Sequence, residues 1–145
     1  MSVLANKFAK AYGSDALEVK VLSASPLELI VMLYDGAIVA IQQAKAGIEI
    51  QDFSLKSARI NKALDIIEGL RVVLDHDKGG DISKNLNDLY EYMKYRLSMA
   101  NLRNDPAMLD ELVGLLSDLH SAWQEIAAQS AQAQPAADGG SYGRV

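Results

Sequence analysis

The residues best suited to acid–base or metal chemistry are few, and they lie apart in this sequence. The two histidines, His76 and His120, fall in different predicted helices, and neither has a second ligand of the right type three or four positions away. Asp75 and Asp77 directly flank His76, and consecutive residues do not share one face of a helix. The spacing therefore predicts no catalytic centre, no metal site and no cofactor, and it indicates a protein that is not an enzyme.

Two further polar motifs also lack the features of a reactive site. Lys78-Gly79-Gly80 has neither the glycine spacing nor the Lys-Ser/Thr ending of a phosphate-binding loop. The paired carboxylates Asp110 and Glu111 lie on the polar face of their predicted helix, where we expect them to do no acid–base work. What remains for function is a surface that binds a partner.

The composition narrows both the class of partner and the compartment. The chain has 145 residues, which is one domain by size, and half of its residues are apolar. Its net charge of −5, with no block of Lys or Arg, argues against a nucleic-acid partner. It has no cysteine, no recognisable secretory signal and no apolar run long enough to span a membrane. We therefore expect a cytoplasmic protein.

The stretch Ser23–Ala37 contains three agreeing signals for the start of a helix. Ser25 is a good N-cap, Pro26 occupies the first helical position, and Glu28 completes a capping box three residues after the cap. The helix that follows, to about residue 50, has apolar residues on most of its circumference. A helix with so narrow a polar face must be covered by neighbours on several sides.

Three more helices with short breaks between them follow this one. Their predicted limits are Asp52 or Ser54 to about His76, ended by Gly79-Gly80, then Asp81 or Ser83 to about Leu102, then Pro106 to about 129. Helices of this length joined by short breaks pack as antiparallel neighbours. The sequence thus predicts an all-α, up-down-up-down four-helix bundle over residues 23–129.

The two ends of the chain have different compositions from the bundle. Residues 1–22 contain Phe8 and Tyr12 at helical spacing over barely two turns, which suits either a disordered terminus or a flap docked on an apolar surface. Residues 130–145 are rich in Ala, Gln, Pro and Gly, and we expect a disordered tail there.

The third predicted helix has two apolar stripes that point in different directions. One stripe is suited to the core, and the other consists of Tyr92, Tyr95, Met99 and Leu102. Tyrosine and methionine are typical of adaptable binding surfaces. This second stripe therefore either packs under the N-terminal segment or binds a partner, and a flap that a partner displaces is compatible with both.

Several long motifs of this chain resemble one known family. In the family's order they are Ser23–Ala37, Gly79–Ile82 with Asn85-Leu86, Leu89–Met93, Ala100–Asp105 and Ala122-Trp123. Over about residues 8–127 the chain is similar to the flagellar secretion chaperone FliS family, and Ala11-Tyr12 matches the family's N-terminal motif.

The resemblance implies a cytoplasmic, non-enzymatic export chaperone. Such a chaperone binds the disordered C-terminal segment of flagellin, prevents its premature polymerisation, and assists its delivery to the export gate of the flagellar type III secretion apparatus. The N-terminal segment of the family is mobile and occupies part of the client's site. The resemblance therefore assigns Phe8 and Tyr12 to this flap and to docking at the export gate.

We expect the flagellin contacts to be apolar or small residues outside the core stripes. They are Tyr92, Tyr95, Met99 and Leu102, with Ile66 and Val73 nearby, and then Gly36 and Ala40 on the small-residue side of the first helix. The alternative is a structural helical bundle without a flagellin client, which self-associates as a homodimer through the same stripe.

Overall fold

The computed structural model describes residues 25–133, and its first helix, α3, begins where the sequence predicts. This helix spans Pro26–Glu49, with Ser25 as its N-cap. Ser25 Oγ accepts a hydrogen bond from the N–H of Glu28 at 3.2 Å, and the Glu28 carboxylate accepts one from the N–H of Ser25 at 3.4 Å. The reciprocal pair satisfies two backbone donors at the helix start, so the predicted capping box is confirmed.

The boundary between the second and third helices differs from the prediction. The second, α4, spans Phe53–Val72 and has Asp52 as its N-cap, one of the two predicted caps. The third, α5, spans His76–Arg103 and has Asp75 as its N-cap, with Asp75 Oδ1 accepting the N–H of Lys78 at 3.1 Å. The chain therefore turns at residues 73–75, and the prediction that α4 continues to about His76 was wrong.

The glycine pair has another role than the one predicted for it. Gly80 has φ 52° and ψ −125°, which interrupts α5 after its first turn. Glycine reaches positive φ without strain, and this is why the break occurs there. The prediction that Gly79-Gly80 ends the second helix was wrong, because Asp75 starts α5 four residues earlier and Gly80 only kinks it.

The fourth helix, α6, spans Pro106–Ala133 and starts as predicted, with a cap followed by proline. Asp105 Oδ1 accepts the N–H of Ala107 at 2.9 Å. Asn104 ends α5 in the left-handed conformation, with φ 50°. At its other end α6 continues through residues 130–133, the first part of the predicted tail. Predictions for residues 1–22 and for the rest of the tail lie outside the described residues.

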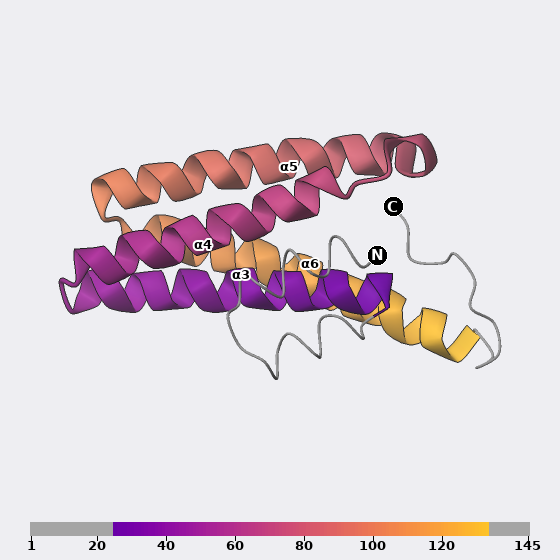
Figure 1. Ribbon diagram of the computed structural model, residues 1–145, viewed down its shortest axis with the longest axis horizontal. Coiled ribbons are helices and arrows are strands. Elements are labelled where there is room, and N and C mark those ends of the chain that lie inside the picture. Colours follow the sequence, from indigo (N-terminus) through magenta and orange to yellow (C-terminus); the bar gives the residue numbers. More distant parts are fainter. Residues whose placement is uncertain (1–24, 134–145) are drawn as a thin grey trace.

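The four helices form one antiparallel bundle, as predicted. Figure 1 shows consecutive helices running in opposite directions, with α6 crossing behind α3 and α4. Within residues 25–133 the secondary structure consists of helices, joined by breaks of two or three residues, and contains no strand. The most extensive packing is between α3 and α4, followed by α3 and α6, while α5 closes the ring through α4 and α6. The topology is therefore up-down-up-down.

Within residues 25–133, the helix α3 supplies more buried hydrophobic residues than any other helix, many of them small. Its length and hydropathy alone would also suit a membrane span, but the same properties are typical of a buried helix in a bundle. The largest fully buried side chains come from all four helices: Leu33, Tyr34, Ile41, Ile60, Ile67, Leu70, Tyr90, Met93, Leu97, Leu109, Leu112 and Leu116. The expectation that α3 needs cover from several sides is confirmed.

The core contains one polar pair, formed by the hydroxyl groups of Tyr34 and Tyr90. These groups hydrogen-bond to each other across the interior, and the rings lie with their centroids 6.4 Å apart. Burial raises the pKa of Tyr34, and the neighbouring side chains of Tyr90 and Trp123 offset only part of this effect. The pair links α3 to α5 through the centre of the bundle. These two helices otherwise pack mainly against α4 and α6 and not against each other.

One end of the bundle is closed by a second set of polar contacts, the polar clamp, formed by Lys56, Ser57, Asn101 and Asn104. Lys56 is only 5% exposed, and its Nζ donates to the Asn101 carbonyl at 2.9 Å and to Asn104 Oδ1 at 2.5 Å. Ser57 Oγ donates to Asn101 Oδ1 at 3.1 Å. The clamp ties the start of α4 to the turn between α5 and α6.

The turn between α3 and α4 at the same end depends on Gly47. A Cβ atom at this position would lie 2.9 Å from the Lys56 nitrogen and 3.1 Å from the Asp52 carbonyl oxygen. Both atoms belong to backbone, which has little freedom to move away. Glycine is therefore needed for this close approach of the two helices.

Candidate binding surfaces

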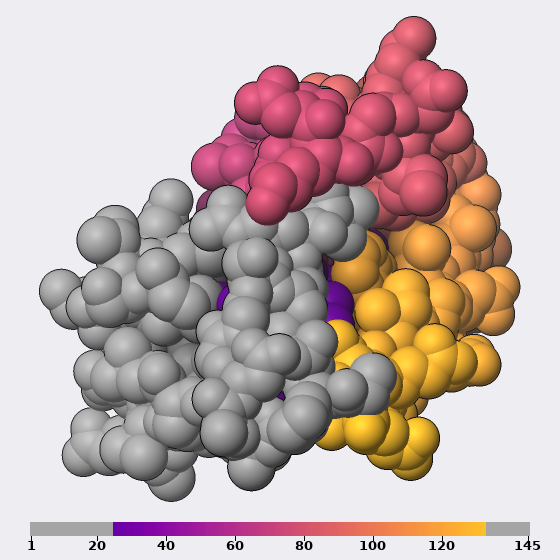
Figure 2. All heavy atoms as spheres, turned by 90° about the vertical axis from the view of Figure 1, so that its right-hand side faces the viewer, coloured from indigo at the N-terminus to yellow at the C-terminus, as the bar shows by residue number. Residues whose placement is uncertain are grey.

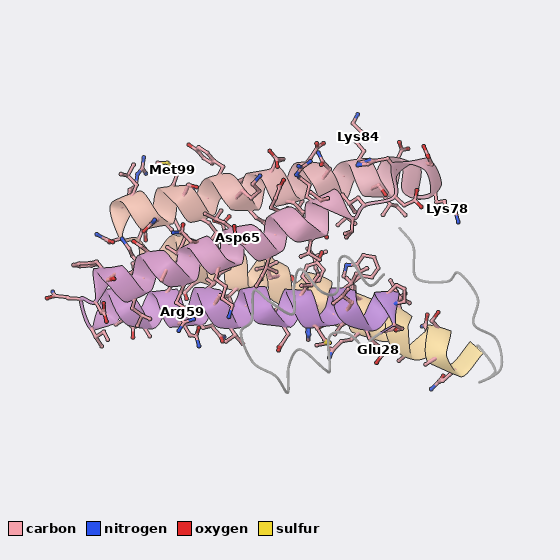
Figure 3. The ribbon with its side chains drawn as sticks, in the orientation of Figure 1. Glu28, Arg59, Asp65, Lys78, Lys84 and Met99 are labelled. Carbon is pink, nitrogen blue, oxygen red and sulfur yellow. The ribbon has the colours of Figure 1, made fainter. Side chains whose placement is uncertain are left out.

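The second apolar stripe of α5 is largely exposed. Tyr92, Tyr95 and Leu102 are 41%, 62% and 76% exposed. Met99 is partly buried and packs against the core, and Figure 3 shows its side chain on the side of α5 that faces away from α4. We name these four residues the α5 surface. The core stripe predicted for this helix was Leu86, Leu89, Tyr90, Met93, Leu97 and Ala100. Its last four residues are buried, whereas Leu86 and Leu89 are partly buried and pack against the core. The prediction that the second stripe points away from the core is thus confirmed for Tyr92, Tyr95 and Leu102, but not for Met99.

Polar contacts to α6 hold one edge of the α5 surface. Tyr92 Oη donates to Glu111 Oε2 at 2.7 Å, and Arg96 donates to Glu111 Oε1 at 3.0 Å through Nε. These hydrogen bonds, from Tyr92 first and Arg96 second, lower the pKa of the Glu111 carboxyl. Tyr92 is thus fixed in direction while its ring stays exposed, whereas Tyr95 is the more exposed of the two.

An ion-pair network lies between α4 and α5. Glu68 binds Arg71 at 2.7 Å and Lys94 at 2.9 Å, and Glu91 binds the same two cations at 3.3 and 3.2 Å. Hydrogen bonds from Arg71 and Lys94 lower the pKa of Glu68 to about 2. The network stabilises the packing of α5 on α4 through partly exposed groups, so each pair contributes modestly.

The two residues expected near the α5 surface do not lie on it. Ile66 is 3% exposed and belongs to the core cluster, because α4 is covered by α3 on one side and α5 on the other. Val73 is partly exposed and caps the C-terminus of α4, beside the start of α5. At 1.5 Å per residue, Tyr92 lies roughly 20 Å further along α5. The structure thus does not bring Ile66 or Val73 together with the four residues of the α5 surface.

Gly36 and Ala40 lie in a different place, on the outer face of α3. They line a hollow of about 460 Å³ that is formed by α3, α4 and α6. We name it the α3 hollow. Its lining consists of Val31, Met32, Asp35, Gly36, Val39, Ala40 and Gln43 from α3, Arg59 and Lys62 from α4, and His120 and Gln124 from α6. Ala40 itself is 2% exposed, so it belongs to the floor, and the 42%-exposed Val39 is the more accessible apolar contact.

The charges of the α3 hollow were not predicted from the sequence. Arg59 and Lys62 are three positions apart and therefore on the same side of α4, which the spacing alone would have indicated. That this side meets α3 and α6 depends on the packing of three helices. Burial, and then the neighbouring charge of Arg59, lower the pKa of Lys62.

The α5 surface and the α3 hollow lie on opposite sides of the bundle. α3 packs against α4 and α6, which separate it from α5. Figure 2 shows the end of the bundle at which α5 begins and α6 ends, and these two segments occupy separate parts of that face.

Phe8 and Tyr12, which were predicted for the flap and for docking at the export gate, lie outside the described residues. Across residues 25–133, no three His, Asp or Glu side chains are grouped as they would be around a metal ion.

Comparisons with known proteins agree with the motifs found in the sequence. A family model described as Flagellar protein FliS matches residues 8–130. The Flagellar secretion chaperone FliS of Salmonella typhimurium is 47% identical over 118 residues, which cover 81% of this chain and 87% of the relative. The protein of the same name from Vibrio cholerae is 39% identical over 117 residues, which cover 81% and 86%.

A relative of lower identity shows the same similarity. The Flagellar secretion chaperone FliS of Bacillus subtilis is 36% identical over 103 residues, covering 71% of this chain and 76% of the relative. The matched residues include the whole described bundle up to residue 130, and the family is one of secretion chaperones rather than enzymes. The chain belongs to the FliS family of flagellar secretion chaperones.

Proposed function

We propose that this protein binds the disordered C-terminal segment of flagellin in the cytoplasm, prevents its polymerisation, and assists its delivery to the flagellar export gate. The observation that carries the proposal is the α5 surface, which keeps three large apolar side chains exposed in a chain of a chaperone family. Large exposed apolar patches on soluble proteins mark interaction sites.

The physical demands of such a client fit the form of this surface. A disordered segment that folds on binding loses about 2–5 kcal/mol or more to ordering, so it needs a wide apolar contact. Tyr92, Tyr95, Met99 and Leu102 repeat at intervals of three and four along about three turns of α5. An amphipathic helix that docks along this stripe would use anchors at the same intervals.

The experiment is a binding titration of the full chain with the C-terminal segment of flagellin, followed by calorimetry and size-exclusion chromatography. We expect a one-to-one complex that keeps flagellin soluble. Tyr95→Ala and Leu102→Ala should each weaken binding with little change in melting temperature, because these side chains are 62% and 76% exposed. Ile126→Ala is the matched control, because Ile126 is an apolar side chain of α6 that is 45% exposed and belongs to neither surface.

Two outcomes would contradict the proposal. A chain that forms an obligate dimer and gives no heat with flagellin would favour the self-associating bundle instead. A sharp fall in melting temperature for Tyr95→Ala would mean that this residue supports the core and is not a docking surface.

Delivery to the export gate forms a separate part of the proposal. It rests on family membership and on Phe8 and Tyr12, which we assign to gate docking. Tyr12→Ala should reduce co-purification of the loaded chaperone with the gate protein while leaving flagellin binding in place. Equal co-purification of both forms would remove Tyr12 from this role.

A further inference from the structure

Glu111 of α6 binds two side chains of α5 at the edge of the α5 surface. Its Oε2 accepts the hydrogen bond of Tyr92 Oη at 2.7 Å, and its Oε1 lies 3.0 Å from Arg96 Nε and 2.8 Å from Arg96 Nη2. Tyr92 and Arg96 are four positions apart and therefore on the same side of α5. The preceding carboxylate, Asp110, instead pairs with Lys45 of α3 at 3.0 Å. The two consecutive carboxylates of α6 thus bind different neighbouring helices.

The contribution of the Glu111 ion pair to stability is expected to be small. The side chains of Glu111 and Arg96 are 39% and 27% exposed, and exposed ion pairs add little to the free energy of unfolding. The helix α5 also packs less extensively on α6 than on α4. The contact with a clear geometric effect is the one to Tyr92, because a hydrogen bond to a charged acceptor is stronger than one between neutral groups.

A tether at the hydroxyl determines where the Tyr92 side chain points. The hydroxyl lies on the long axis of the ring, so holding it fixes χ1 and with it the direction of the ring. The ring itself remains available for contact, since Tyr92 is 41% exposed. A protein that must immobilise a flexible side chain on binding loses about twofold to tenfold in affinity, and a side chain that is already held avoids this loss.

We propose that Glu111 is a positioning residue for the client, which holds the Tyr92 ring in the direction that a segment docked on the α5 surface contacts. This inference rests on the proposed function and adds to it a residue of α6 that acts through Tyr92. Arg96 has a supporting role, because its two nitrogens place the carboxylate and balance its charge. The proton of the Tyr92 hydroxyl is donated to Glu111, so the client meets the ring and the oxygen lone pairs.

The test measures binding of the flagellin C-terminal segment to the full chain and to Glu111→Ala. We expect Glu111→Ala to weaken binding about twofold to tenfold, because the complex must then order the Tyr92 side chain. Asp110→Ala is the matched control, since it removes the same charge from the neighbouring position of α6 and breaks an ion pair that lies away from α5. Its affinity should stay within about twofold of the parent.

A double-mutant cycle shows whether Glu111 acts through Tyr92. Tyr92→Phe keeps the ring and removes the tether, so it should weaken binding about as much as Glu111→Ala does. Adding Glu111→Ala to Tyr92→Phe should then change the affinity by less than about twofold. Glu111→Gln keeps an acceptor oxygen for the hydroxyl and should recover most of the affinity. A direct contact between Glu111 and the client would instead give the same loss in both backgrounds, which would overturn the inference.

A further measurement needs no client. Helical residues adopt χ1 near 180° or −60°, and NMR three-bond couplings of Tyr92 should report one of these rotamers in the parent and an average of both in Glu111→Ala. Asp110→Ala should give the couplings of the parent. Averaged couplings in the parent would mean that the tether does not hold the ring, and this would overturn the inference without any binding experiment.

The outcomes separate this inference from the proposed function. If Tyr95→Ala and Leu102→Ala weaken binding but Glu111→Ala does not, the inference is overturned and the chaperone role stands. Equal losses for Glu111→Ala and Asp110→Ala would indicate a general effect of charge, which also overturns it. If the parent does not bind flagellin, the proposed function fails and this inference fails with it.

Discussion

Replacing Tyr90 by phenylalanine tests how the interior of this bundle is held in register. Tyr34 and Tyr90 are 0% and 1% exposed, and their hydroxyls hydrogen-bond to each other. In Tyr90→Phe the Tyr34 hydroxyl stays in the core without this partner. A buried hydroxyl left unsatisfied costs about 1–3 kcal/mol. We therefore expect Tyr90→Phe to lose about 1–3 kcal/mol of unfolding free energy.

The double variant Tyr34→Phe/Tyr90→Phe distinguishes a lost hydrogen bond from a simple loss of packing. It removes both hydroxyls and keeps both rings, so no tyrosine donor remains unpaired. We therefore expect the double variant to be more stable than the sum of the two single effects, by about 1 kcal/mol. The sign of this coupling follows from the general rule that replacing both partners by apolar groups costs less than replacing one.

The assay is urea unfolding monitored by circular dichroism. With a slope of about 2 kcal/mol/M, the expected loss moves the Tyr90→Phe midpoint by roughly 0.5–1.5 M at an unchanged slope. Tyr95→Phe is the matched control, because Tyr95 is 62% exposed and should stay within about 0.5 kcal/mol of the parent. Strictly additive single effects, or a Tyr90→Phe variant as stable as the parent, would refute the reasoning.

Three further predictions use the same unfolding measurement. Lys56→Met should lose about 1–3 kcal/mol, because it leaves the clamp acceptors of Asn101 and Asn104 without their charged donor. Gly47→Ala should lose about 1–3 kcal/mol through the backbone clash at 2.9 Å. Gly114→Ala should instead gain up to about 1 kcal/mol, because Gly114 is exposed on α6 and a Cβ atom there meets nothing within 4 Å. Hydrogen bonds lower the pKa of Glu68 from 4.5 to about 2. The contribution of Glu68 to the free energy of unfolding is therefore fully present above pH 4.5 and is lost as the pH falls towards 2. Glu68→Gln should therefore flatten the acid limb of the stability curve over that interval, and high salt should reduce the difference, since the Glu68 side chain is 40% exposed.

Each of these has an outcome that would contradict it. An unchanged midpoint for Lys56→Met would mean that the clamp adds nothing to stability. Equal effects of alanine at Gly47 and Gly114 would show that the turn between α3 and α4 relaxes to admit a methyl group. An acid limb that is identical in Glu68→Gln would mean that another carboxylate carries the pH dependence.

Local signals predicted most of the fold because they act within a single turn of helix. The capping box of Ser25 and Glu28 fixed the start of α3, and Asp105 with Pro106 marked the start of α6. The boundary between α4 and α5 was predicted wrongly because two start signals compete there. Asp75 caps a helix directly before a glycine pair that also favours a break, and both occur: a helix start at His76 and a kink at Gly80.

The candidate surfaces were predictable only as far as one helix determines them. The positions of Tyr92, Tyr95 and Leu102 around the helix, relative to the core stripe, predicted that these side chains would be exposed. This was possible because both stripes belong to α5. Ile66 has the same kind of edge position on α4, but a helix with neighbours on two sides buries its edges, and the sequence does not reveal how the neighbours are placed. Arg59 was missed for the same reason, because its surroundings come from three helices.

The polar clamp lies at one end of the bundle, so the two ends are held together by different kinds of contact. Lys56 and the close approach at Gly47 tie three helices together at one end. Towards the opposite end, α4 and α5 are tied through the ion pairs of Glu68 and Arg71, which are partly exposed and screened by salt, whereas Lys56 of the clamp is buried. We therefore expect the backbone amides near the start of α5 to exchange with solvent faster than those near the clamp, and salt to widen this difference.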